Sequence, residues 1–122
     1  MPAELEEISG ITFSADFKEL VAIQDEDGIL YFINPRTGIV ERKLPFWKEG
    51  DYEDLVFTAP NRLWVVKSTS TIYEIIGWEN PEQMQVIKHK SHLCKDNNVE
   101  GLGYDPRSNS LLMACKGDVV RG

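Results

Sequence analysis

The chain has 122 residues, of which 42% are hydrophobic, so its length suits one small domain with a modest core. Its 20 acidic and 13 basic residues leave a formal net charge of −7, which disfavours attraction to nucleic-acid phosphates or anionic lipid. No apolar run approaches the roughly 18 residues that a membrane-spanning helix needs. The chain also starts without the basic and apolar regions of a signal peptide. We therefore expect neither a nucleic-acid partner nor a membrane span.

The first part of the chain contains four short runs rich in β-branched and aromatic residues. They lie at 8–14, 19–25, 28–34 and 39–44. Turn residues separate the runs, as in the segment 34–38, where Pro35 fixes φ and Gly38 permits a positive φ. Short runs bounded by turn residues are typical of strands in consecutive hairpins. We therefore expect four antiparallel strands between residues 8 and 44.

The second part of the chain repeats this plan. Its runs lie at 54–58, 62–67, 71–76 and 83–89, with Trp64 as a candidate core residue. The third run, Ile72-Tyr73-Glu74-Ile75, resembles Leu30-Tyr31-Phe32-Ile33 at the same place in the first unit. A third unit supplies runs at 101–105 and 110–115 before the sequence stops at Gly122.

Each unit begins with a similar phrase. The phrases are Ser9-Gly10-Ile11-Thr12-Phe13, Glu53-Asp54-Leu55-Val56-Phe57 and Glu100-Gly101-Leu102-Gly103-Tyr104. A period in the forties with four strands per unit is typical of β-propeller blades. We therefore predict an all-β fold, a partial β-propeller of about two and a half four-stranded antiparallel blades. Residues 1–122 would form one incomplete domain, with blades at about 8–44, 53–89 and 100–122, whose exposed sheet edges favour self-association.

The acids that lead two of these phrases are the candidate metal ligands. In a propeller the first strand of each blade lies nearest the axis, so Glu53 and Glu100 should converge on one mouth of the central channel. The first unit has Ser9 at this position, and Glu7 lies two residues earlier. Carboxylates that meet favour a cation, and oxygen ligands favour Ca²⁺. The alternative is that these acids accept hydrogen bonds from backbone amides and tie the blades together.

The ends of the second strands are candidate ligand contacts. Asp25, Lys67 and Lys116 lie at or directly after these ends, where the residue type differs from blade to blade. Such variation is typical of a binding surface, and the alternative is that strand ends vary because they are exposed. We also expect Cys94 and Cys115 to be free thiols, with a disulfide as the alternative, since sequence gives no distance between them.

Three segments resemble the SdiA-regulated family of six-bladed β-propeller proteins. They are Glu7-Ile8-Ser9-Gly10-Ile11, Gln24-Asp25-Glu26-Asp27-Gly28-Ile29-Leu30-Tyr31 and Asn98-Val99-Glu100-Gly101-Leu102-Gly103-Tyr104-Asp105-Pro106. Related phrases recur in phytase-like, NHL-type and lactonase-type propellers. The resemblance implies a domain about twice as long as this chain, often exported to the periplasm or cell exterior. By similarity to calcium-dependent propeller lactonases and phytases, Glu53 and Glu100 are the positions that correspond to metal ligands.

These observations favour a protein that binds a small molecule or a protein partner at the channel mouth, with Ca²⁺ as the candidate cofactor. One alternative is a calcium-dependent hydrolase of phosphate esters or lactones, in which the cation polarises the bond being cleaved. Another is a purely structural interaction module. Fold resemblance alone does not decide whether the protein is an enzyme.

Overall fold

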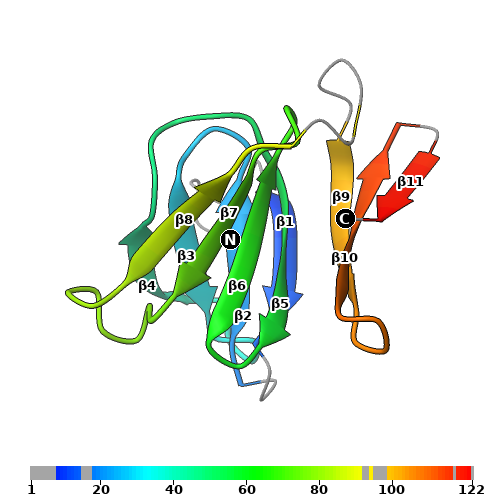
Figure 1. Cartoon of the computed structure of the whole chain (residues 1–122). Coiled ribbons are helices and arrows are strands. Elements are labelled where there is room, and N and C mark those ends of the chain that lie inside the picture. The colour runs from blue at the N-terminus through cyan, green and yellow to red at the C-terminus, as the bar shows by residue number, and fades with distance from the viewer. Residues whose placement is uncertain (1–7, 15–17, 92–93, 95–98, 117, 122) are drawn as a thin grey trace.

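The computed structural model describes residues 8–14, 18–91, 94, 99–116 and 118–121 (Figure 1). These residues form eleven strands in three antiparallel sheets. Within the same ranges there is no helix long and apolar enough to cross a membrane. The predicted all-β class is confirmed.

Each sheet is a meander in which neighbouring strands follow one another in sequence. The first contains β1 (Ile8–Phe13), β2 (Leu20–Gln24), β3 (Ile29–Ile33) and β4 (Val40–Pro45). The second contains β5 (Tyr52–Ala59), β6 (Arg62–Lys67), β7 (Ile72–Ile76) and β8 (Gln85–His89). The third contains β9 (Val99–Asp105), β10 (Ser110–Cys115) and β11 (Asp118–Arg121). The ten strands that we expected are present, with ends that differ by no more than two residues, and β11 is an addition.

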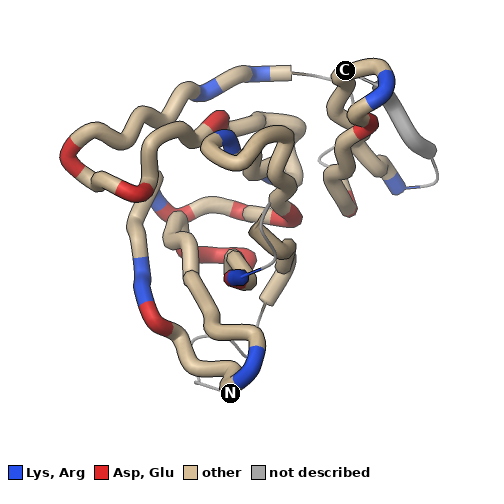
Figure 2. The backbone as a smooth tube through the Cα atoms, turned by 90° about the horizontal axis from the view of Figure 1, so that it is seen from below, with Lys and Arg blue, Asp and Glu red and all other residues tan. Residues whose placement is uncertain are grey.

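The first strands of the three sheets are neighbours, because β5 packs against both β1 and β9. The three sheets therefore face one another around their innermost strands, which is the arrangement of propeller blades. Their starts lie at one end of the sheets, the upper end in Figure 1. Seen from below in Figure 2, the third sheet lies to one side of the other two.

Two apolar cores hold the blades together. The first lies between the first and second sheets and includes Val21, Phe32, Leu55 and Tyr73. The second lies between the second and third sheets and is formed by Val66, Ile72, Cys94, Val99, Leu102 and Met113. Strands buried on both faces in this way explain why β6 and β7 read as nearly continuous apolar runs.

The two cysteines form a disulfide, so the expectation of free thiols is wrong. Cys94 precedes β9 and Cys115 ends β10, and their Cα atoms are 5.5 Å apart. Sequence could not give this distance, because it depends on the register of β9 and β10. Cys115 pairs with Val99 in that register, so the disulfide ties the segment before β9 to the end of the neighbouring strand.

Candidate binding site at the channel mouth

Each innermost strand has a β-bulge near its start, and the bulged residue is the first residue of the repeated phrase. In β1 the pairing with β2 shifts between Ile8 and Gly10, which leaves Ser9 as the extra residue. The pairing shifts in the same way around Glu53 in β5 and around Glu100 in β9. A bulge re-aims a side chain and is often found next to a functional site. Ser9, Glu53 and Glu100 are therefore structurally equivalent positions at the upper end of the sheets.

Four carboxylates from three blades interact at this end. The pKa of Glu53 is raised above its ordinary value of 4.5, first by burial and then by repulsion from Asp51, Asp25 and Glu100. The structure thus brings the predicted residues Glu53 and Glu100 into electrostatic reach of one another, together with Asp25. We call the four residues Asp25, Asp51, Glu53 and Glu100 the mouth carboxylates.

Asp25 is held in place by its backbone. Its carbonyl oxygen accepts a hydrogen bond from the amide of Tyr52 in the next blade, with an N–O distance of 2.8 Å. The carbonyl oxygen of Ser68 accepts the equivalent bond from Val99, at 3.4 Å. Each of these two bonds joins the end of the second strand of one blade to the first strand of the next. The bond from Tyr52 fixes the position from which the Asp25 side chain extends.

Two oxygen atoms at the mouth are buried without a hydrogen-bond partner in the part of the chain that the structure describes. They are Oδ1 of Asp25 and Oγ of Ser9. A buried acceptor without a donor or cation is costly, so such atoms often mark the place of an ion or ordered water. Ser9 therefore contributes an oxygen to the mouth although it is not an acid.

Asp54 has the structural role that we had considered for Glu53 and Glu100. Its Oδ1 accepts a hydrogen bond from its neighbour Leu55 and its Oδ2 accepts one from Leu102 in β9, both at 2.9 Å. Gly10 makes room for it in the adjacent blade, because a Cβ there would lie 2.8 Å from both Cα and Oδ1 of Asp54. Asp54 therefore ties the second blade to the third, and burial raises its pKa. The second residue of the repeated phrase is Gly10 in the first unit, Asp54 in the second and Gly101 in the third. This change from glycine to aspartate and back is the sequence signal that could have revealed the role of Asp54.

The predicted lysines lie in different surroundings. The side chain of Lys67 lies near Gly50, with its Nζ 6.0 Å from the centre of the Tyr52 ring. Lys67 pairs with Tyr52 across β5 and β6, so its ammonium group lies at the same end as the mouth carboxylates. Lys116 follows β10 and is exposed. Glu7 lies outside the described residues.

No three His, Cys, Asp or Glu side chains come together closely enough to hold a metal ion within the described ranges. The mouth carboxylates therefore form an acidic patch and not a closed coordination cage. At this end of the sheets, the further oxygen ligands available to a cation are the Ser9 hydroxyl and backbone carbonyl groups.

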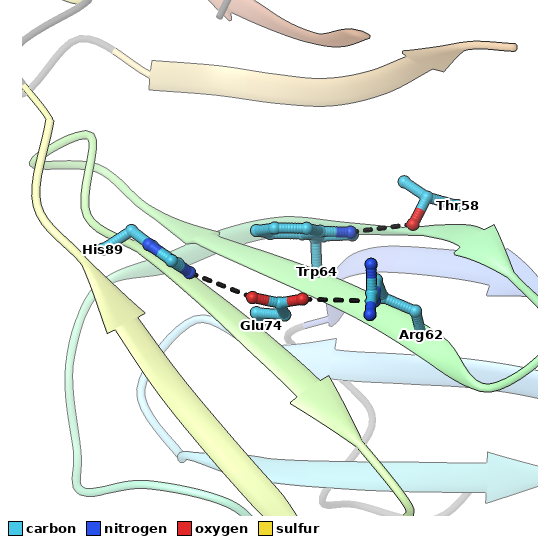
Figure 3. A network of polar contacts seen from close by, with 5 residues as sticks. All are labelled: Thr58, Arg62, Trp64, Glu74 and His89. Carbon is cyan, nitrogen blue, oxygen red and sulfur yellow. Dashed lines mark hydrogen bonds and ion pairs between the residues drawn. The ribbon is translucent and has the colours of Figure 1, made fainter. Parts of the chain in front are cut away.

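A second acidic centre lies away from the mouth, on the face of the second sheet (Figure 3). Glu74 in β7 is only 9% exposed and accepts from Arg62 and His89, each at 3.1 Å. The predicted core residue Trp64 is partly buried beside it, donates to Thr58 at 2.9 Å and stacks at 5.7 Å from His89. Both carboxylate oxygens of Glu74 have partners, so this network joins β6, β7 and β8. It leaves neither oxygen of Glu74 free to bind a ligand.

Successive antiparallel meanders packed through their first strands define the chain as a β-propeller protein. The chain belongs to the SdiA-regulated family, whose model matches residues 2–117. No curated protein matches it in sequence.

Solved structures are similar to this chain in fold. A streptogramin B lyase structure matches 99% of this chain and 38% of its own, with 14% identity and a TM-score of 0.69. The β-propeller domain of Cps50 (Swd1) from Myceliophteria thermophila matches 93% of this chain and 38% of its own, with 14% identity and a TM-score of 0.62. The C-terminal WD40 domain of Sif2 matches 94% and 31%, with 13% identity and a TM-score of 0.60. This chain spans well under half of each structure, and at these identities the likeness shows the fold alone.

Proposed function

We propose that this chain is part of a propeller binding module whose acidic channel mouth binds a positively charged group, with Ca²⁺ as the first candidate. The observation that carries the proposal is that β-bulges place Ser9, Glu53 and Glu100 at equivalent positions of three adjacent blades, at the same end as Asp25. Like charges brought together in a partly buried place repel unless a proton or a cation neutralises them. A bound cation would remove this repulsion.

The types of donor at the mouth favour Ca²⁺ over a transition metal. Ca²⁺ takes six to eight oxygen ligands from carboxylates, carbonyls and water, in flexible geometry. Glu53, Glu100 and Asp25 are not close enough together to form a cage in this structure, so their side chains would have to move toward the ion to supply the charged oxygens, with Ser9 supplying a neutral one. Glu7 and the later blades of a whole propeller are the places from which further ligands would come. A small molecule or protein partner with a cationic group would use the same charges, with Lys67 at the edge of the site.

Calcium titration of the full-length protein tests this proposal. We expect Ca²⁺ to raise the melting temperature, because a ligand that binds only the folded state stabilises it. Glu53→Gln and Glu100→Gln should each reduce the calcium-dependent shift. Glu82→Gln is the matched control, since it removes the same charge from an exposed turn residue between β7 and β8.

A calcium shift that is absent, or equal in Glu53→Gln and the wild type, would overturn the assignment of the mouth as a calcium site. The same result would remove the calcium-dependent hydrolase, because that reaction needs the cation as its Lewis acid. Isothermal calorimetry on the three variants measures the affinity directly and separates weak binding from none.

A further inference from the structure

A cavity lies at the lower end of the sheets, opposite the channel mouth. It has a volume of about 360 Å³ and lies between the first and second blades. Its apolar walls are formed by Val21 and Phe32 from one blade and by Phe57 and Trp78 from the other. We call this cavity the lower pocket. These four wall residues all belong to the described part of the chain.

The walls suit an apolar, flat group. The rings of Phe57 and Trp78 meet edge to face, with their centroids 5.5 Å apart. Val21, Phe32 and Trp78 are buried and lie behind the surface of the pocket, whereas Phe57 is only partly buried and offers its ring to a ligand. A cavity of a few hundred Å³ with aromatic walls and a few polar groups is typical of small-molecule sites.

Two carboxylates give the lower pocket its charge. Glu19 directly precedes β2, two residues before Val21, and Glu79 follows Trp78 in the turn after β7. The cation Arg42 also lies at this pocket, since its guanidinium is 5.1 Å from the centre of the ring of the wall residue Phe32 and donates to the carbonyl oxygen of Trp78. The acids therefore outnumber this guanidinium at the rim.

We propose that the lower pocket is a second binding site, which takes a small organic cation with an apolar body. The aromatic walls would enclose the apolar part, and ring faces also attract a positive charge. Glu19 and Glu79 would pair with the ammonium group at the rim. This site uses different residues from the channel mouth and does not rest on the calcium proposal.

Three probes of similar size and different charge test the charge preference. Isotope-labelled full-length protein is titrated with 4-phenylbutylamine, 4-phenylbutanol and 4-phenylbutyrate, and backbone amide shifts are followed by NMR. We expect shifts centred on Val21, Phe57 and Glu79. The amine should bind about fivefold more tightly than the alcohol, as two partly exposed ion pairs allow, and the carboxylate should bind most weakly.

Variants separate the walls from the charges. Glu19→Gln with Glu79→Gln should abolish the preference for the amine while leaving the alcohol unaffected. Phe57→Ala should weaken the amine and the alcohol together, with the amide spectrum reporting that the fold is intact. Glu26→Gln with Glu49→Gln removes the same two charges from exposed residues at the other end of the sheets, so it should leave all three affinities unchanged.

Several results would overturn the proposal. The first is equal binding of the amine and the carboxylate, and the second is a preference for the amine that survives in the double variant. Shifts centred on the mouth carboxylates instead of the lower pocket would show that the amine responds only to the general acidity of the protein. The absence of shifts with all three probes would show that the cavity is not a ligand site.

Discussion

Glu53 and Asp54 are adjacent in β5, and the bulge at Glu53 gives their side chains different surroundings. Asp54 accepts two backbone hydrogen bonds and is packed against Gly10. Glu53 is surrounded by other acids. Removal of the Asp54 carboxylate and removal of the Glu53 carboxylate should therefore change the free energy of unfolding by different amounts.

We expect Asp54→Ala to lower the free energy of unfolding by about 2–3 kcal/mol, because it leaves the amides of Leu55 and Leu102 without their charged acceptor. Urea denaturation of the full-length protein measures this change. Glu53→Ala is the matched neighbour, and without calcium it should cost much less. Equal losses in the two variants would contradict the different roles of the two carboxylates.

The raised pKa of Glu53 predicts how stability depends on pH. A carboxyl whose pKa is higher in the folded state than in the unfolded state binds its proton more tightly when folded. Its contribution to stability is therefore complete below its ordinary pKa of 4.5 and falls as pH rises through the higher folded value. Without calcium, the wild type should gain more in melting temperature than Glu53→Gln when the pH falls from 7 to 5. Identical pH profiles of the two proteins would contradict a raised pKa at Glu53.

Part of this site could be predicted from sequence. The repeated phrase placed Glu53 and Glu100 at equivalent positions, and stacking of equivalent strands brings such positions together. The bulges could not be predicted, because a bulge is a property of the pairing between two strands. Asp54 was missed because its partners are a glycine in one blade and a backbone amide in another.

At the scale of elements, short strands bounded by turn residues were predicted correctly in all three sheets. The strand β11 was missed, because its sequence Asp118-Val119-Val120-Arg121 has only two apolar residues. A run this short has no clear pattern of its own and is defined by its pairing with β10.

The disulfide between Cys94 and Cys115 gives the third blade a second link besides backbone pairing. The two residues are 21 apart in sequence, and closing a loop of this size in the unfolded state typically stabilises a protein by about 3 kcal/mol. We expect a reducing agent to lower the melting temperature of the wild type. A Cys94→Ser, Cys115→Ser double variant should melt at the lower temperature with or without the reducing agent. A wild type insensitive to reduction would contradict the link.

At the scale of the whole molecule, the face of the first blade that points away from the second blade has no other sheet of the described residues packed against it. The second blade covers the opposite face through the first core. This outer face carries the third apolar cluster, whose residues Ala22, Tyr31 and Ile33 are buried. Ile11 and Phe13 lie on it as well, because they pair with Ala22 and Leu20, and they are 48% and 46% exposed.

An apolar sheet face with these exposed residues is a contact surface for another sheet. In a propeller each blade packs on the next, so further blades would cover it in a closed ring. In residues 1–122 expressed alone, Ile11 and Phe13 are the exposed apolar side chains of this face. We expect this isolated chain to self-associate, and light scattering coupled to gel filtration should give a mass above 13.9 kDa.

Substitution of the exposed pair tests whether this face causes the association. Ile11→Ser with Phe13→Ser should return the isolated chain toward the monomer mass, whereas Ile87→Ser removes an exposed apolar side chain from β8 as a control. In a longer protein whose further blades pack on the first, the amides of β1 should exchange with deuterium more slowly than in the isolated chain. Association that is unchanged in the double variant would place the contact elsewhere, for instance on the third sheet. A stable wild-type monomer would show instead that two full blades and a partial third can fold without a partner for this face.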